Sequence, residues 1–220
     1  MAQREESERV NSGRPGEAPR ILQVSLGSAG TLTLELHPCV YNPSDDTWLL
    51  IEALMKLKSQ GKAYDRIVDV GSGTGILALA AYKLFKPPVL AAIDISPYAV
   101  ELSRRNLPPE VHVVRCFGLS CLESSWDLVI LNPPYLPGEP PREPRDCLEW
   151  VEYAWSGSGL MYELLLEAFN VSREVLTVYS TLSPVDSGAL ALKLGFKVER
   201  LGFRRFFYEE LRAILAYRGD

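Results

Sequence analysis

The chain of 220 residues is slightly long for one domain and too short for two domains of ordinary size. Its hydrophobic content of 47% and charged content of 23% are those of an ordinary globular protein. The net charge of −5 argues against direct binding to nucleic acid through bulk positive charge, because neutralising phosphates requires clustered Lys and Arg.

The N-terminal segment differs in composition from the rest of the chain. Residues 1–20 are polar and rich in Gly, Pro and charge, and they lack the apolar core of a signal peptide. We therefore expect a disordered tail, followed by a single domain over residues 21–220. No apolar run approaches the ~18 residues that span a bilayer, so no membrane partner is expected.

The four cysteines bear on the compartment and on metal binding. They lack the C-x-x-C spacing of a zinc site, and only two histidines are present. The sequence therefore predicts no metal site. We expect free thiols, in a protein of the reducing cytoplasm, at Cys39, Cys116, Cys121 and Cys147.

The first half of the chain contains signals for both strands and helices. Alternating apolar residues around a GSAG turn predict a small hairpin over residues 21–36, and acidic residues open a helix over 45–58. From residue 66, short β-branched runs alternate with helical segments. The strands are expected at 66–70, 89–93, 111–114 and 127–131, and the helices at 76–85 and 97–106.

The second half continues this alternation. A proline-rich segment, 136–144, is given no element, and the elements after it are helices near 160–169 and 185–194 and strands at 174–180, 197–201 and 211–217. Strands that alternate with helices and lack strict polar alternation indicate an open, mostly parallel sheet with helices on both faces. Ligands bind such sheets at the carboxyl ends of the strands.

Asp69 lies near the end of the first of these strands, just before a glycine-rich turn. Gly71, Gly73 and Gly75 have the spacing G-x-G-x-G, not the G-x-G-x-x-G of dinucleotide sites. A carboxylate at this place would repel a pyrophosphate but attract an ammonium group. S-adenosylmethionine carries an α-ammonium and no phosphate, so the turn favours that cofactor.

The second strand ends at Asp94, about 20 positions after Gly75, which is the spacing at which an acid binds ribose hydroxyls. A cap for the following helix is the alternative role for Asp94. Because Ser96 already suits that cap, we favour ribose binding.

The fourth strand ends in Asn132-Pro133-Pro134-Tyr135, and parallel strands would bring all three strand ends to one edge. A rigid turn with a surface tyrosine is the alternative interpretation. The Asn132 side-chain carbonyl and the Pro133 backbone carbonyl could each accept a hydrogen of a planar amide. The prolines would hold these acceptors rigid, and Tyr135 would offer a flat wall.

Together, five motifs resemble those of class I S-adenosylmethionine-dependent methyltransferases. More narrowly, they resemble the HemK-type glutamine methyltransferases of archaea and eukaryotes. The motifs are YNPSDDT (41–47), DVGSGTG (69–75), AIDISPYAV (92–100), DLVILNPPY (127–135) and AWSGSGLMYELL (154–165). The resemblance implies a Rossmann-like α/β fold, whose mostly parallel seven-stranded sheet has helices on both faces and an antiparallel last strand.

The resemblance also implies an activity. Family members methylate the glutamine side chain in the Gly-Gly-Gln motif of class I translation release factors, and they convert S-adenosylmethionine to S-adenosylhomocysteine. Members of this branch also resemble one half of a heterodimer with a small zinc-binding activator protein. Both the release factor and the activator are therefore expected partners.

By position in the motifs, the resemblance assigns roles to individual residues. Thr47, Asp69, Gly71 and Gly73 would contact the cofactor, Asp94 its ribose, and Asn132 both cofactor and substrate. The family often has an acid near the adenine, where this chain has Cys116-Phe117. Backbone atoms of those two residues would then meet the adenine.

Other interpretations remain open from the sequence alone. N-P-P-Y also occurs in methyltransferases that act on exocyclic amines of adenine or guanine in RNA or DNA, and a lysine is a further alternative acceptor. A protein that keeps the fold for interaction without catalysis belongs to a different class. Trp150 and Trp155 are expected to be packed in the core, and His37 and His112 are not expected to be catalytic.

Overall fold

The computed structural model describes residues 19–122, 125–139 and 143–219. The tail expected over residues 1–20 lies outside the described residues except for its last two positions. Its disorder, and the single-domain boundary at residue 21, therefore remain predictions. Within the described ranges, no helix combines the length and the apolar character needed to cross a membrane.

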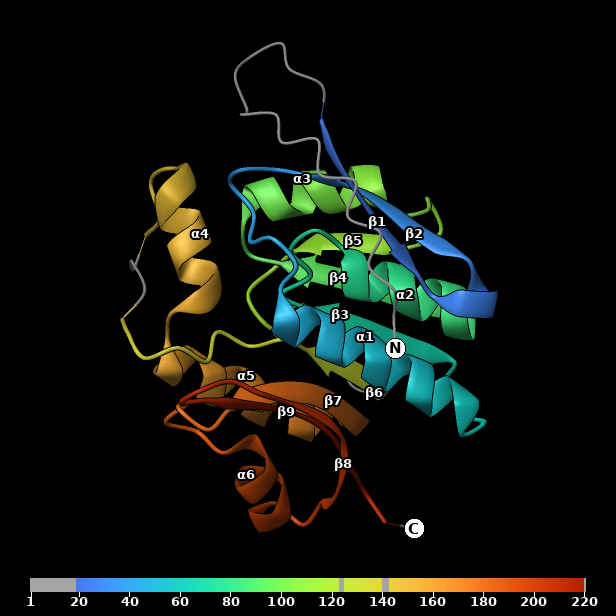
Figure 1. The fold of residues 1–220 in the computed structure, drawn as a ribbon, viewed down its shortest axis with the longest axis vertical. Coiled ribbons are helices and arrows are strands. Elements are labelled where there is room, and N and C mark those ends of the chain that lie inside the picture. The colour runs from blue at the N-terminus through green and yellow to red at the C-terminus, as the bar shows by residue number, and fades with distance from the viewer. Residues whose placement is uncertain (1–18, 123–124, 140–142, 220) are drawn as a thin grey trace.

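A seven-stranded sheet forms the centre of the molecule, with strand order β5-β4-β3-β6-β7-β9-β8 (Figure 1). The five strands from β5 to β7 in this order are parallel, and β9 runs antiparallel to both of its neighbours, β7 and β8. The predicted mostly parallel sheet with an antiparallel last strand is confirmed. The strands are β3 (Arg66–Val70), β4 (Val89–Asp94), β5 (His112–Arg115), β6 (Trp126–Leu131), β7 (Ser172–Ser180), β8 (Lys197–Arg205) and β9 (Glu210–Tyr217).

Six α-helices accompany the sheet within the described ranges: α1 (Asp45–Ser59), α2 (Ile76–Phe85), α3 (Pro97–Asn106), α4 (Cys147–Trp155), α5 (Ser158–Val171) and α6 (Ser187–Lys193). Apolar residues of α1 and α2 pack with one face of the sheet, and those of α5 and α6 pack with the other. Helices therefore cover both faces, as the sequence predicted. The predicted N-terminal hairpin is also present, as β1 (Arg20–Ser25) and β2 (Thr31–Leu36).

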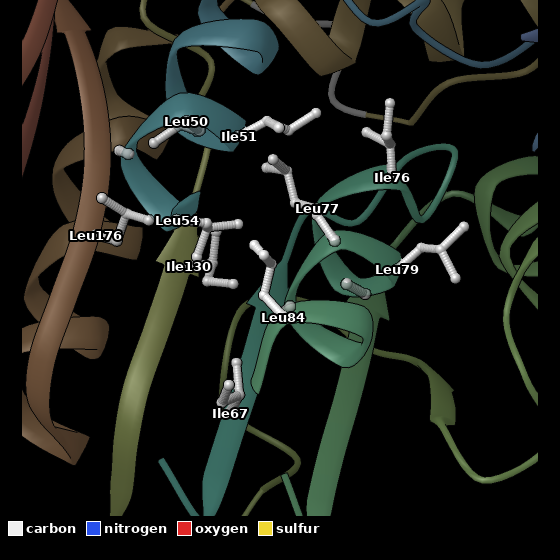
Figure 2. Close-up of a cluster of buried hydrophobic side chains, with 14 of the residues drawn as sticks. Leu50, Ile51, Leu54, Ile67, Ile76, Leu77, Leu79, Leu84, Ile130 and Leu176 are labelled. Carbon is white, nitrogen blue, oxygen red and sulfur yellow. The ribbon is translucent and has the colours of Figure 1, made fainter. Parts of the chain in front are cut away.

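The pleat of the strands divides the core into two clusters. In β6, Leu128 and Ile130 belong to the cluster under α1 and α2, whereas Val129 and Leu131 belong to the cluster under α5. Figure 2 shows side chains of the first cluster, where Leu54 of α1 lies next to Ile130. Because neighbouring residues of one strand are buried on opposite faces, the strands carry near-continuous apolar runs.

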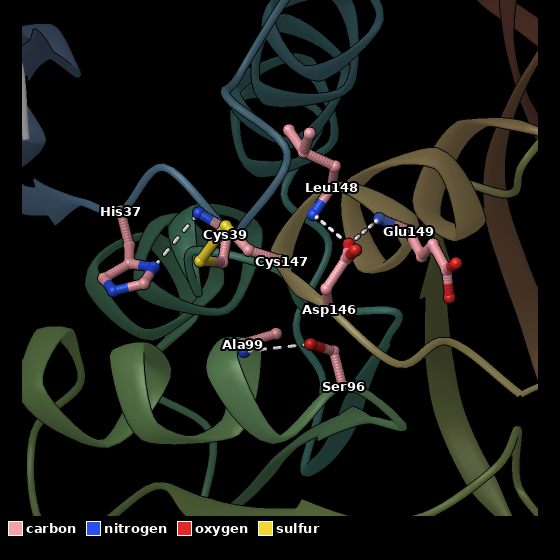
Figure 3. The surroundings of a disulfide bond; sticks show 8 residues. All are labelled: His37, Cys39, Ser96, Ala99, Asp146, Cys147, Leu148 and Glu149. Carbon is pink, nitrogen blue, oxygen red and sulfur yellow. Dashed lines mark hydrogen bonds between the residues drawn. A yellow bond between two sulfur atoms is a disulfide. The ribbon is translucent and has the colours of Figure 1, made fainter.

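The expectation of free thiols is wrong. All four cysteines form disulfides: Cys39 with Cys147, and Cys116 with Cys121. The Cys39–Cys147 bond joins the segment before α1 to the first residue of α4, across a sequence separation of 108 (Figure 3). The spacing rules apply to cysteines that are close in the sequence, whereas Cys39 and Cys147 come together only in the folded chain.

Replacing Cys147 with Ser should lower the free energy of unfolding by about 2–5 kcal/mol, because the long loop that this disulfide closes regains its entropy in the unfolded chain. Urea unfolding without reductant measures the change. Cys121→Ser is the matched control. It opens a loop whose ends are 5 positions apart, so its effect should be smaller. Four dye-reactive thiols in the denatured, unreduced wild type would contradict the pairing.

Candidate active site

A cavity of about 470 Å³ opens at the carboxyl ends of β3, β4 and β6. Val70, Ile93 and Leu131 are register partners at the ends of these strands, so the residues that follow them gather at one edge. Apart from Asp69, every site residue predicted from the sequence lines this strand-end cavity: Thr47, Gly71, Gly73, Asp94, Cys116, Phe117, Asn132, Pro133, Pro134 and Tyr135.

The glycine-rich turn leaves room on the cavity side. Gly71 and Gly73 have φ angles of +72° and +53°, in the left-handed region that favours glycine. A Cβ added to Gly71 would meet no heavy atom within 4 Å, and one added to Gly73 would only approach Val40 and the Gly71 carbonyl at 3.9 and 4.0 Å. The turn itself is fixed, because the Gly71 and Ser72 amides donate to the Ile93 carbonyl at 2.8 and 2.9 Å.

Asp69 lies beneath the cavity and not in its wall. Its side chain is fully buried, and its Oδ2 accepts from the Ala78 amide in the first turn of α2 at 3.0 Å. The other oxygen, Oδ1, has no hydrogen-bond partner among the described residues. Burial raises the pKa of Asp69 to about 7; the Ala78 hydrogen bond opposes this shift and the nearby Asp94 charge adds to it.

Asp94 takes part in the turns around it as well as lining the cavity. Its Oδ2 accepts from the Gly73 amide at 2.9 Å and its Oδ1 from the Ser96 amide at 2.8 Å. Ser96 also caps α3, as predicted, by accepting from the Ala99 amide. The two roles considered for Asp94, capping the turn that follows it and binding ribose, are therefore not mutually exclusive. Each carboxylate oxygen can accept a further hydrogen bond, so both roles are compatible.

The N-P-P-Y segment presents an acceptor that no protein group satisfies. The side-chain oxygen of Asn132 is buried and has no partner among the described residues. Pro133 and Pro134 beside it are buried, and Tyr135 is half-buried. Buried polar atoms are nearly always hydrogen-bonded, so this one is suited to a ligand donor.

The start of α1 forms another wall of the cavity. Thr47 donates from its amide and its hydroxyl to Asp46 Oδ1 at 2.6 and 3.1 Å, while Asp46 Oδ2 accepts from the Tyr135 hydroxyl at 3.2 Å. Tyr41 also lines the cavity, and burial, reinforced by the charge of Asp46, raises the pKa of Tyr41 to about 12. The sequence reasoning missed Asp46 and Tyr41, although both lie in the YNPSDDT motif.

The α4 helix supplies a third wall that was not predicted. Trp150, Tyr153 and Trp155 line the cavity, so the expectation that both tryptophans are packed in the core is wrong. The reason is that α4 buries none of its residues, and it stands beside the sheet and not against it (Figure 1). Asp146, which caps α4 by accepting from the amides of Leu148 and Glu149, was the available sequence signal (Figure 3).

The Cys116-Phe117 pair follows β5 and lines the cavity. The Cys116 amide donates to the Asp94 carbonyl at 3.0 Å, which fixes the pair against the end of β4. The disulfide to Cys121 closes the loop that contains Phe117. An aromatic ring and backbone atoms are thus available here, without an acidic side chain in the pair.

Comparison with known proteins agrees with this architecture. A family model described as the methyltransferase small domain matches residues 39–143. The chain is 29% identical over 198 residues to a Methanocaldococcus jannaschii protein provisionally named a protein N5-glutamine methyltransferase, and the match spans 85% of this chain and 96% of that protein. Methyltransferase HEMK2 of Mus musculus is 30% identical over 149 residues, spanning 63% of this chain and 67% of the mouse protein.

A solved structure shares the fold. The structure described as the E. cuniculi Mtq2-Trm112 complex, responsible for methylation of the eRF1 translation termination factor, aligns with a TM-score of 0.63. The alignment covers 82% of this chain and 99% of the matched chain, at 20% sequence identity.

Proposed function

This chain belongs to the HemK-type class I methyltransferases, and on that premise we propose that it methylates the side-chain amide nitrogen of a glutamine in a translation release factor, with S-adenosylmethionine as donor. The observation that carries the proposal is the buried, unpartnered oxygen of Asn132 at the strand-end cavity. An oxygen in this position requires a hydrogen-bond donor, and a primary amide supplies one.

The residues around the cavity fit the donor. Gly71 and Gly73 leave open space where a methionine chain could pass close to the backbone. Asp69, with its unpartnered Oδ1 beneath the cavity, would attract an ammonium group through its charge, and Asp94 has acceptor capacity left for ribose hydroxyls. Thr47 and the Cys116-Phe117 pair would complete the contacts. When bound, S-adenosylmethionine supplies an electrophilic methyl group on a sulfonium.

The acceptor nitrogen must be held in place, because an amide lone pair is delocalised into its carbonyl. The Asn132 oxygen would accept one amide hydrogen and the Pro133 carbonyl the other. Together they would point the nitrogen at the methyl group along the in-line path. Orientation of this kind supplies up to about 7–11 kcal/mol in general. The prolines make the two acceptors rigid before the substrate arrives.

The transfer balances without a strong base. The carbon–nitrogen bond forms as the carbon–sulfur bond breaks, so the positive charge passes from sulfur to the amide nitrogen. The methylated amide cation is very acidic and gives up a proton to a neighbouring oxygen acceptor or to water. The products are the N-methylated glutamine and S-adenosylhomocysteine.

We extend the proposal to a partner protein and a compartment. In the described part of the chain, β5 is an edge strand that pairs only with β4, and its residues are exposed or half-buried. An open edge of this kind can accept a strand from another chain. A small, zinc-binding activator seated on β5 is the heterodimer we propose, in the cytoplasm, where release factors act.

The direct test is methyl transfer from labelled S-adenosylmethionine. We expect label in a purified class I release factor and none in its Gln→Ala variant at the Gly-Gly-Gln motif, with higher turnover when the activator is added. Parallel reactions contain tRNA, rRNA and DNA. Label in nucleic acid with none in the release factor would show that the methyl acceptor is a nucleobase and not a glutamine.

Asn132→Ala should lower kcat about 100-fold or more, because one of the two acceptors that orient the amide is lost. Cofactor affinity, measured by calorimetry, should change much less. Asn170→Ala removes an exposed amide from α5 and serves as the matched control, with wild-type kcat expected. Wild-type turnover in Asn132→Ala would rule out the role given to this side chain.

Cofactor binding should weaken as the pH falls below about 7. In the free protein Asp69 holds a proton below its pKa of about 7, and only the ionised carboxylate attracts an ammonium group. The dissociation constant should therefore rise by up to about tenfold per pH unit below that value, and level off above it.

Calorimetry from about pH 5.5 to 8.5 measures this dependence. Asp69→Asn should remove it, while Asp65→Asn, a change at an exposed acid just before β3, should retain it. An identical pH profile in wild type and Asp69→Asn would show that another group is titrating.

A further inference from the structure

Asp46 is a buried carboxylate that contacts two of the predicted site residues. It is the second residue of α1, is only 3% exposed and lines the strand-end cavity. One of its oxygens holds the amide and the hydroxyl of Thr47, and the other accepts from the hydroxyl of Tyr135, which lies 89 positions later in the chain. The two contacts come from different walls of the cavity.

Stabilising the start of α1 does not by itself explain this carboxylate. Ser44 already occupies the N-cap, and its amide donates to Thr47 Oγ1. Asp45, also in the first turn, is more exposed and forms an ion pair with Arg204 at 2.9 Å. An acid near a helix N-terminus stabilises the helix from the surface, so the helix alone does not require a second, buried acid.

We propose that Asp46 is a positioning residue for the transfer reaction. It fixes the ring of Tyr135, which lies in the N-P-P-Y segment beside Asn132, relative to Thr47, a predicted cofactor contact. The inference rests on the proposed function. The prolines fix the backbone of the N-P-P-Y segment, but they do not fix the two side-chain torsions of the tyrosine. A hydrogen bond at the hydroxyl, the far end of the ring, restrains both rotations.

The surroundings keep this hydrogen bond in one form. Burial and the charges of Asp46 and nearby groups raise the pKa of Tyr135 above its usual range, so its hydroxyl stays protonated and donates. The start of α1 is itself fixed to β8, because Arg204 bridges Asp45 and Glu52 at 2.9 and 3.2 Å. Asp46 therefore holds the ring from an anchored helix.

The consequence for the reaction is geometric. The ring of Tyr135 bounds the space in which a planar amide would lie against Asn132 and Pro133. If the ring moved, the amide could leave the in-line path without any loss of cofactor affinity. Misplacement of a reacting group by about 1 Å lowers rates by about 100-fold.

The test compares Asp46→Ala, Asp46→Asn, Tyr135→Phe and the Asp46→Ala/Tyr135→Phe double variant, all assayed with release factor. We expect Asp46→Ala to lower kcat at least about tenfold, with KM for S-adenosylmethionine changed much less. Asp46→Asn should recover most of that loss, because its oxygen can still accept from the Thr47 amide while its NH₂ donates to the tyrosine hydroxyl. A role limited to stability would give no such recovery in kcat.

Because Asp46 acts through the Tyr135 hydroxyl, the two changes should not multiply. The double variant should turn over no more slowly than Asp46→Ala alone. Asp65→Asn, a change at an exposed acid before β3 that leaves Asp46 and the ion pairs of α1 intact, is the matched control and should keep wild-type kcat. Multiplied losses in the double variant, or wild-type kcat in Asp46→Ala, would overturn the proposal. If Asp46→Ala does not fold, wild-type kcat in Tyr135→Phe would overturn it equally.

A readout without turnover separates this inference from the proposed function. With fluorotyrosine in place of tyrosine, the ¹⁹F resonance of Tyr135, assigned by its loss in Tyr135→Phe, should shift or split in Asp46→Ala as the ring gains freedom. An unchanged resonance would contradict the restraint. If wild type transfers no methyl group to any protein glutamine, the proposed function fails, and the resonance still decides whether Asp46 holds the ring.

Discussion

The site depends on one constraint: three parallel strands end in register. Val70, Ile93 and Leu131 are matched across β3, β4 and β6, and each is followed at once by a residue that lines the cavity. Backbone hydrogen bonds of the sheet thus fix the relative positions of Gly71, Asp94 and Asn132, which are far apart in the sequence. Neighbouring strands in a sheet lie about 4.8 Å apart, so the three ends define one face of ligand size.

Burial and function act against each other at this edge. The two buried side-chain oxygens without partners at the site, those of Asp69 and Asn132 among the described residues, are unfavourable in a folded protein unless a ligand supplies a donor. The same strands are otherwise built from buried apolar side chains, which keep the edge rigid. Such local departures from good packing are expected where a fold carries a site.

Most of the sheet, and the site residues that follow the ends of its strands, could be predicted from the sequence, because both depend on local patterns. The runs at 66–70 and 76–85 fix their own elements by β-branched content, glycine placement and apolar periodicity. Three features could not be found in this way. The α4 helix buries no side chain and so lacks a core-facing pattern, the Cys39–Cys147 pair joins distant segments, and the Asp46–Tyr135 contact joins two walls that only the fold brings together.

The Cys39–Cys147 bond also divides the molecule topologically. The covalent ring that it closes contains α1 and β3 to β6, and so includes Thr47, Asp94 and the N-P-P-Y segment, whereas β7, β8 and β9 lie outside it. Cross-linking restricts the unfolded chain only within the closed ring. The bond therefore restricts the unfolded chain in the segment that carries most of the cavity lining, whereas the segment that contains β7, β8 and β9 gains no such restriction.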